Sequence, residues 1–93
     1  MINDKMLLDA LHQAGHTGVV EVDLQEGNDS TGEPAFFIRL GMDAAIPVAQ
    51  LRWANVEPLH GWVKNWVREQ AGDTNYPYVR FYSLSEVEAH ATS

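Results

Sequence analysis

The chain has no cysteine in its 93 residues. This absence excludes a disulfide framework, a thiol nucleophile and a zinc site built from thiolates, and it is typical of proteins from a reducing compartment. Basic residues are also few, because six Lys and Arg stand against 13 Asp and Glu and the net charge is −7. Direct nucleic-acid binding depends on clustered Lys and Arg that contact phosphates. We therefore predict no direct nucleic-acid binding.

Long hydrophobic runs are missing as well. No stretch approaches the ~20 apolar residues that span a bilayer. Asp4 and Asp9 interrupt the first segment, which does not fit a signal peptide. We expect a cytoplasmic protein that does not bind a membrane. Hydrophobic residues still make up 45% of the chain, which is enough for a core, and the length fits one domain over residues 1–93.

Motifs of the common catalytic classes are also absent. No serine lies in a Gly-x-Ser-x-Gly elbow, and no Gly-Lys-Ser/Thr phosphate loop occurs. His12 and His16 have the spacing of a helical metal pair, but Gly15 between them is expected to end the helix. We predict no catalytic residue, no metal site and no cofactor.

One catalytic alternative remains on a predicted strand. Glu21 and Asp23 share a strand face about 7 Å apart, near the separation that acid/base pairs use. Nearby arginines would keep both carboxylates ionised, which does not suit a general acid. An enzyme built on Glu21, Asp23 and a histidine would require one carboxyl with a strongly raised pKa.

Two amphipathic helices are predicted. Residues 57–72 carry apolar side chains at intervals of three and four, which form one stripe on a helix. That stripe consists of Leu59, Trp62, Val63, Trp66 and Val67. Pro58 suits the first turn and Gly72 the end. Residues 3–14 form the other helix, which Asn3 or Asp4 can cap and Gly15 ends. Its apolar stripe consists of Leu7, Leu8 and Leu11.

Alternating apolar and polar residues predict strands at residues 19–25, 35–40 and 76–83. A further strand is predicted at residues 48–53, although this segment also fits a helix. The Gly- and Asp-rich residues 26–34 predict a loop, which would join the first two strands in an antiparallel hairpin. Ser and Glu at capping-box spacing predict a short helix after residue 83.

The expected order is therefore α-β-β-β-α-β with a short C-terminal helix. This order predicts an α+β fold in which two helices cover one face of a mostly antiparallel sheet. The α-β-β-β-α part resembles double-stranded RNA-binding domains in element order alone. Those domains contact phosphates with basic residues, and the resemblance covers no motif, so it implies no function for this acidic chain.

The other face of the predicted sheet is the candidate binding surface. It is expected to carry Val19, Glu21, Asp23, Gln25, Phe37, Arg39, Gln50, Arg52, Tyr78, Arg80 and Tyr82. Cross-strand pairs of carboxylates and arginines are an ordinary finish for a solvated sheet face. Three aromatic side chains are more than such a surface needs, and Tyr and Arg are enriched where interfaces carry most binding energy.

Two functions fit this surface. The first is a small acidic, non-catalytic module that binds a protein through the charged and aromatic residues Glu21, Asp23, Phe37, Arg39, Arg52, Tyr78, Arg80 and Tyr82. A sharper form is an inhibitor or immunity-type protein that occupies the basic site of a nucleic-acid enzyme. The alternative is a homodimer that pairs its open faces and holds a small anionic ligand with Arg39, Arg52 or Arg80.

Overall fold

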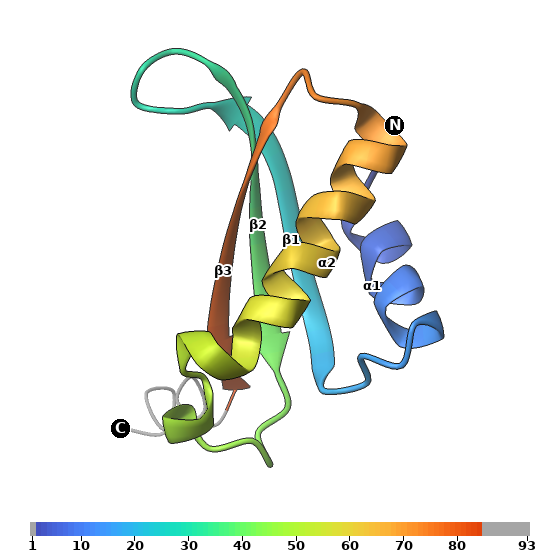
Figure 1. Ribbon diagram of the computed structural model, residues 1–93, viewed down its shortest axis with the longest axis vertical. Helices are drawn as coiled ribbons and strands as arrows, with labels where there is room; N and C mark the ends of the chain where they lie inside the picture. The colour runs from blue at the N-terminus through green and yellow to red at the C-terminus, as the bar shows by residue number, and fades with distance from the viewer. Residues whose placement is uncertain (1, 85–93) are drawn as a thin grey trace.

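A computed structural model of the chain describes residues 2–84, apart from the side chain of Val48. The elements are α1 (Asp4–Gln13), β1 (Val19–Asn28), β2 (Pro34–Met42), the 3-10 helix η1 (Val48–Gln50), α2 (Trp53–Ala71) and β3 (Tyr76–Ser83). The α+β class is confirmed, with the order α-β-β-α-β (Figure 1). The short helix predicted after residue 83 falls on residues outside the described range.

The strands form one sheet in the order β1-β2-β3. β1 and β2 are antiparallel, as the hairpin predicted, and Asp23 is paired with Arg39. β2 and β3 are parallel, with Phe37 beside Tyr78, so the sheet is mixed and not mostly antiparallel. β2 and β3 are parallel because α2 connects them, and a helical crossover returns the chain so that the next strand runs in the same direction.

The strand predicted at residues 48–53 is wrong. Val48–Gln50 form η1, and α2 begins at Trp53, where the amides of Asn55 and Val56 bond to the Arg52 carbonyl. A six-residue segment is too short to distinguish a period of two from a period of 3.6. The buried Val56 extends the α2 stripe toward its N-terminus. Pro58 therefore lies inside the helix and not in its first turn.

Both helices pack on the same face of the sheet (Figure 1). The centre of the core consists of Leu7, Leu11, Ile38, Leu40, Val63 and Val67. Trp62 and Trp66 are only half-buried and pack at the border of this core. Neither α1 nor α2 covers the opposite face of the sheet (Figure 1). Within residues 2–84, neither helix combines the length and apolar character that crossing a bilayer requires.

α1 begins at the predicted cap. The Asn3 side chain accepts a hydrogen bond of 2.9 Å from the Met6 amide, which satisfies one of the free donors of the first turn. After the helix, Gly15 has a φ of +91°, in the left-handed region that glycine adopts without strain. The helix boundary predicted from these two residues is confirmed.

A β-bulge at the start of β1 changes which valine faces the core. The pairing of β1 with β2 shifts between Val19 and Glu21, so Val20 is an extra residue in the strand. Val19 is 1% exposed and Val20 is 36% exposed. Simple alternation predicted the reverse for both valines, and Val19 does not belong to the open surface.

Candidate binding face

The open face is the side of the sheet that the helices leave uncovered. Strand pairing brings together on it Glu21, Asp23, Gln25, Phe37, Arg39, Gly41, Tyr76, Tyr78, Arg80 and Tyr82. All the predicted site residues except Arg52 are in this set. Arg52 is the exposed N-cap residue of α2, and its predicted place on the face depended on the strand at residues 48–53, so that placement is wrong.

A first stack of rings covers one end of the open face. The Phe37 and Tyr78 rings lie 5.7 Å apart at 14°, and each side chain is 39% exposed. The Tyr76 ring extends the group, with its centroid 4.8 Å from that of Tyr78. These contacts hold three exposed rings in defined orientations, which is a favourable starting point for binding.

A second stack lies toward the other end. The Arg39 guanidinium lies over the Tyr82 ring, 4.9 Å from its centroid, as a cation–π contact. The Tyr82 hydroxyl donates a hydrogen bond of 2.9 Å to Glu21. Burial and, next, this bond to a carboxylate raise the pKa of Tyr82. The three side chains therefore form one connected group across all three strands.

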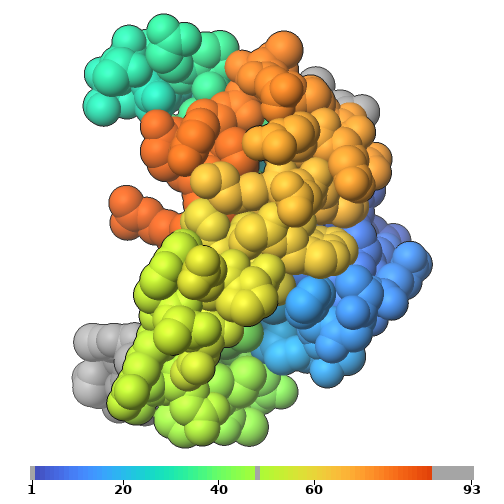
Figure 2. Space-filling view, viewed as in Figure 1, coloured from blue at the N-terminus to red at the C-terminus, as the bar shows by residue number. Residues whose placement is uncertain are grey.

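The β1–β2 loop is fastened to the open face through Asp29. Its carboxylate accepts hydrogen bonds from the Thr31 hydroxyl (2.6 Å), from two loop amides and from the Tyr78 hydroxyl (3.0 Å). These hydrogen bonds lower the pKa of Asp29 to about 2, and the bond from the Thr31 hydroxyl has the largest effect. The hydrogen bond to Asp29 in turn raises the pKa of Tyr78. The loop projects past the neighbouring surface in Figure 2, where it borders a recess.

Both stacks line a hollow of about 480 Å³ on the open face. Its other lining residues include Arg80, whose side chain is exposed and makes no hydrogen bond or ion pair with the residues described here. Asp23 and Arg39 are strand neighbours, yet the ion pair found within residues 2–84 joins Arg68 and Asp73. The carboxylates of β1 and the arginines of the face thus do not neutralise one another by direct contact.

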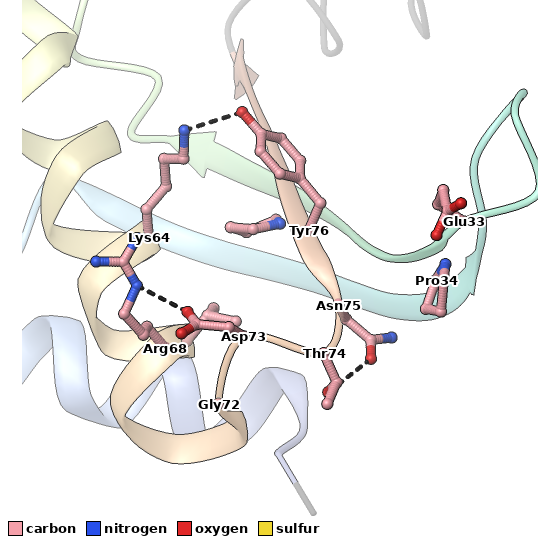
Figure 3. Close-up of a pocket in the computed structure, with 11 residues that line it drawn as sticks. Glu33, Pro34, Lys64, Arg68, Gly72, Asp73, Thr74, Asn75 and Tyr76 are labelled. Atoms are coloured by element: carbon pink, nitrogen blue, oxygen red, sulfur yellow. Dashed lines mark hydrogen bonds and ion pairs between the residues drawn. The ribbon is translucent and has the colours of Figure 1, made fainter.

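A second hollow, of about 300 Å³, lies where the end of α2 meets β3 (Figure 3). Lys64 donates a hydrogen bond of 3.2 Å to the Tyr76 hydroxyl. The Arg68 Nε atom lies 3.0 Å from an Asp73 oxygen. Because both cations already have partners, this hollow is less suited to an added anion than the open face.

A third hollow, of about 430 Å³, lies on the helix side of β3. Trp53, which is 58% exposed, and His60 contribute to its lining, and their rings meet edge to face at 5.0 Å. Burial, and then the nearby Lys64 charge, lower the pKa of His60. Val79 and Phe81 add apolar surface from β3.

The two histidines at helical spacing have separate structural contacts. His12 Nε2 donates to the Val19 carbonyl at 2.6 Å. The His16 ring packs edge-on against Trp62 at 5.4 Å. Across the described part of the chain, no three His, Asp or Glu side chains gather in a way that would hold a metal ion.

Three residues that belong to the open face or bond to it were not predicted. Tyr76 lies two residues before Tyr78 and therefore on the same side of the strand, so extending the predicted alternation by one step would have found it. Asp29 and Gly41 carry no such signal, because their roles depend on a loop that folds onto β3 and on a ring that crosses β2. Comparison of the chain with protein-family models, curated proteins and solved structures gave no match.

Proposed function

We propose that the chain is a small acidic, non-catalytic protein of the cytoplasm that docks another protein on its open face. The observation that carries this proposal is the fixed row of exposed rings, in which Phe37 and Tyr78 are each 39% exposed. Rigid aromatic side chains lose little conformational entropy on binding, and they form the energetic centre of many interfaces. A purely solvated sheet face has no need of them.

The charge next to these rings indicates the chemistry of the partner. Residues 21–33 contain no Lys or Arg, and their carboxylates are Glu21, Asp23, Glu26, Asp29 and Glu33. A basic protein surface complements this acidic border. A nucleic-acid enzyme presents such a surface to phosphates, which favours the inhibitor or immunity-type form of the proposal. Binding should then weaken steeply as salt rises.

The test compares the proteins that immobilised variants retain from a lysate, quantified by mass spectrometry at two salt concentrations. Phe37→Ser removes one exposed ring from β2 and leaves the charge of the face unchanged. Met6→Ser is the matched control, since Met6 is also 39% exposed but lies on α1. We expect the wild type and the control to retain a basic protein that Phe37→Ser loses at least about tenfold. Equal retention by all three would contradict the proposal.

The second candidate is a homodimer that pairs its open faces and binds a small anionic ligand. Arg80 lines the hollow of about 480 Å³ and has no hydrogen-bond or ion-pair partner among residues 2–84, which favours this function. Calorimetric titration with benzoate and with inorganic phosphate tests this function. Binding that disappears in Arg80→Gln would support it, and no heat from either compound at millimolar concentration would count against it.

A further inference from the structure

The outer edge of β3 has no partner in the described chain. β3 is the last strand in the order β1-β2-β3. Apart from the sheet ladder, no backbone hydrogen bond in residues 2–84 involves residues 76–82. In Figure 1 no other strand of the coloured ribbon lies beside this edge. An open strand edge presents unpaired N–H and C=O groups and is a template for pairing with another chain.

Hollows lie on both sides of this edge strand. Arg80 and Phe81 line both the hollow on the open face and the one beside Trp53. A strand added along β3 would direct alternate side chains to the two sides of the sheet. Its side chains would therefore enter both hollows while its backbone formed hydrogen bonds with the free N–H and C=O groups of β3. This is the general mode of binding by strand addition.

We propose that the occupant of this edge is a second copy of the chain, with the two β3 strands antiparallel about a two-fold axis. The two sheets would then form one continuous sheet. The local charge of β3 permits this occupant, because β3 contains no carboxylate and one cation, Arg80. The acidic side chains that give each chain its net charge of −7 therefore do not oppose one another along this strand.

The side chains of β3 also select a register. When the axis passes through Val79, Arg80 lies opposite Tyr78 of the second copy, and Tyr76 lies opposite Tyr82 of that copy. On the other side of the sheet, Val79 meets its own copy and Phe81 faces Pro77. The Pro77 carbonyl can accept a hydrogen bond, but proline has no N–H to donate, so each end of the pairing lacks one ladder bond. A register centred on Arg80 would instead place the two arginines opposite one another, which is unfavourable.

This dimer goes beyond the proposed function and is independent of it. Phe37 and Arg39 lie on β2, one strand away from the edge, so they remain uncovered in the dimer. A protein could thus dock on each open face. Failure of the dimer would leave the docking proposal intact.

Cross-linking tests the register directly, because the chain has no cysteine of its own. In the proposed register, the Cα atoms of two Val79→Cys chains lie about 4.5–5.5 Å apart, which suits a disulfide. The two Tyr76→Cys residues would be roughly 20 Å apart. Under mild oxidation we expect Val79→Cys to cross-link at least tenfold faster than Tyr76→Cys or Arg80→Cys. Faster cross-linking of either control would overturn the register.

Light scattering over a range of concentrations tests the association itself. Tyr78→Lys places a cation opposite Arg80 in both halves and should weaken dimerisation about tenfold. Tyr78→Glu removes the same ring, but its carboxylate attracts Arg80 of the second copy, so this variant should dimerise more tightly than Tyr78→Lys. The double variant Tyr78→Lys with Arg80→Glu should restore dimerisation, because the two charges are again opposite. A wild type that stays monomeric at millimolar concentration would overturn the proposal, as would the opposite order of the two Tyr78 variants. Loss of the dimer in Phe37→Ser would assign it to the open faces instead.

Discussion

The hydroxyl of Tyr82 bonds to Glu21 although these residues lie on the two outer strands of the sheet, with β2 between them. The ring passes over β2 at Gly41. A Cβ atom at that position would lie 2.8 Å from the Tyr82 hydroxyl oxygen and 3.0 Å from the Glu21 Cβ. The absence of a side chain at Gly41 is therefore what allows β1 and β3 to be joined across the open face.

Gly41→Ala should destabilise the protein by about 1–3 kcal/mol, the usual cost of forcing extra volume into a packed site. The added methyl group would displace the Tyr82 ring and break its bond to Glu21. Urea unfolding measures the change in free energy, and the near-ultraviolet circular dichroism of the tyrosines should report the loss of a fixed ring.

Gly61→Ala is the matched control for this substitution. Gly61 lies inside α2, and a Cβ atom there would meet nothing within 4 Å. Alanine should therefore stabilise the helix by about 0.5–1 kcal/mol through its higher helix propensity. If both alanine variants changed stability in the same direction, the bridge across Gly41 would not be the cause.

The second prediction concerns the bulge in β1. Val19→Ala should cost about 2 kcal/mol, because Val19 is 1% exposed and its removed methyl groups leave space in the core. Val20→Ala, at 36% exposure, should stay within about 0.5 kcal/mol of the wild type. Thermal or urea unfolding of the two single variants decides between the bulge and simple alternation, which predicts the opposite ranking.

The sequence was sufficient for α1, the hairpin, β3 and the part of α2 from residue 57 onward, because each has an apolar period or a cap that depends on its own residues. It missed the first turn of α2, which begins at Trp53. Asn3 and Gly15 bound α1 as predicted, and Leu7 and Leu11 are buried as their spacing required. Residues 48–53 were different. Their alternation is only six residues long, and the apolar residue that decides in favour of a helix, Val56, lies beyond them.

The sequence predicted only those site residues whose position follows from the alternation of side chains along a strand, which we call strand parity. Parity placed Phe37, Tyr78 and Tyr82 on one face with Arg39 and Arg80, and strand pairing brings these residues together. Parity cannot reveal the bulge at Val20, since an extra residue depends on the partner strand. It also cannot show that Arg39 stacks on Tyr82 and makes no ion pair with Asp23, because side-chain directions decide that contact.

The third prediction is a loss of stability as His60 becomes protonated. Burial, and secondly the charge of Lys64, lower the pKa of His60 below its ordinary 6.5. The folded state therefore binds this proton less tightly than the unfolded state does. The contribution of His60 should be fully present above pH 6.5 and decline as the pH falls through the folded-state pKa. Urea unfolding between pH 7.5 and about pH 5 measures this decline.

His60→Gln should remove that part of the pH dependence, since glutamine does not titrate. Lys64→Ala should shift it to higher pH, because the nearby positive charge that opposes protonation is lost. A wild-type pH profile that His60→Gln leaves unchanged would show that this histidine has the same proton affinity in the folded and unfolded states.

The last prediction concerns the loop that Asp29 fastens to the open face. Hydrogen bonds from Thr31, and further ones from Tyr78 and the loop amides, lower the pKa of Asp29 from 3.8 to about 2. The carboxylate form is thus favoured by folding, and its contribution should be present above pH 4 and disappear as the pH falls toward 2. An NMR titration of the Asp29 carboxyl carbon should show the low midpoint directly. In Thr31→Ala that midpoint should rise toward 3.8, because the leading hydrogen bond is lost, and the amide of residue 33 should exchange faster as the loop loosens. An unchanged midpoint in Thr31→Ala would mean that Tyr78 and the amides hold the carboxylate on their own.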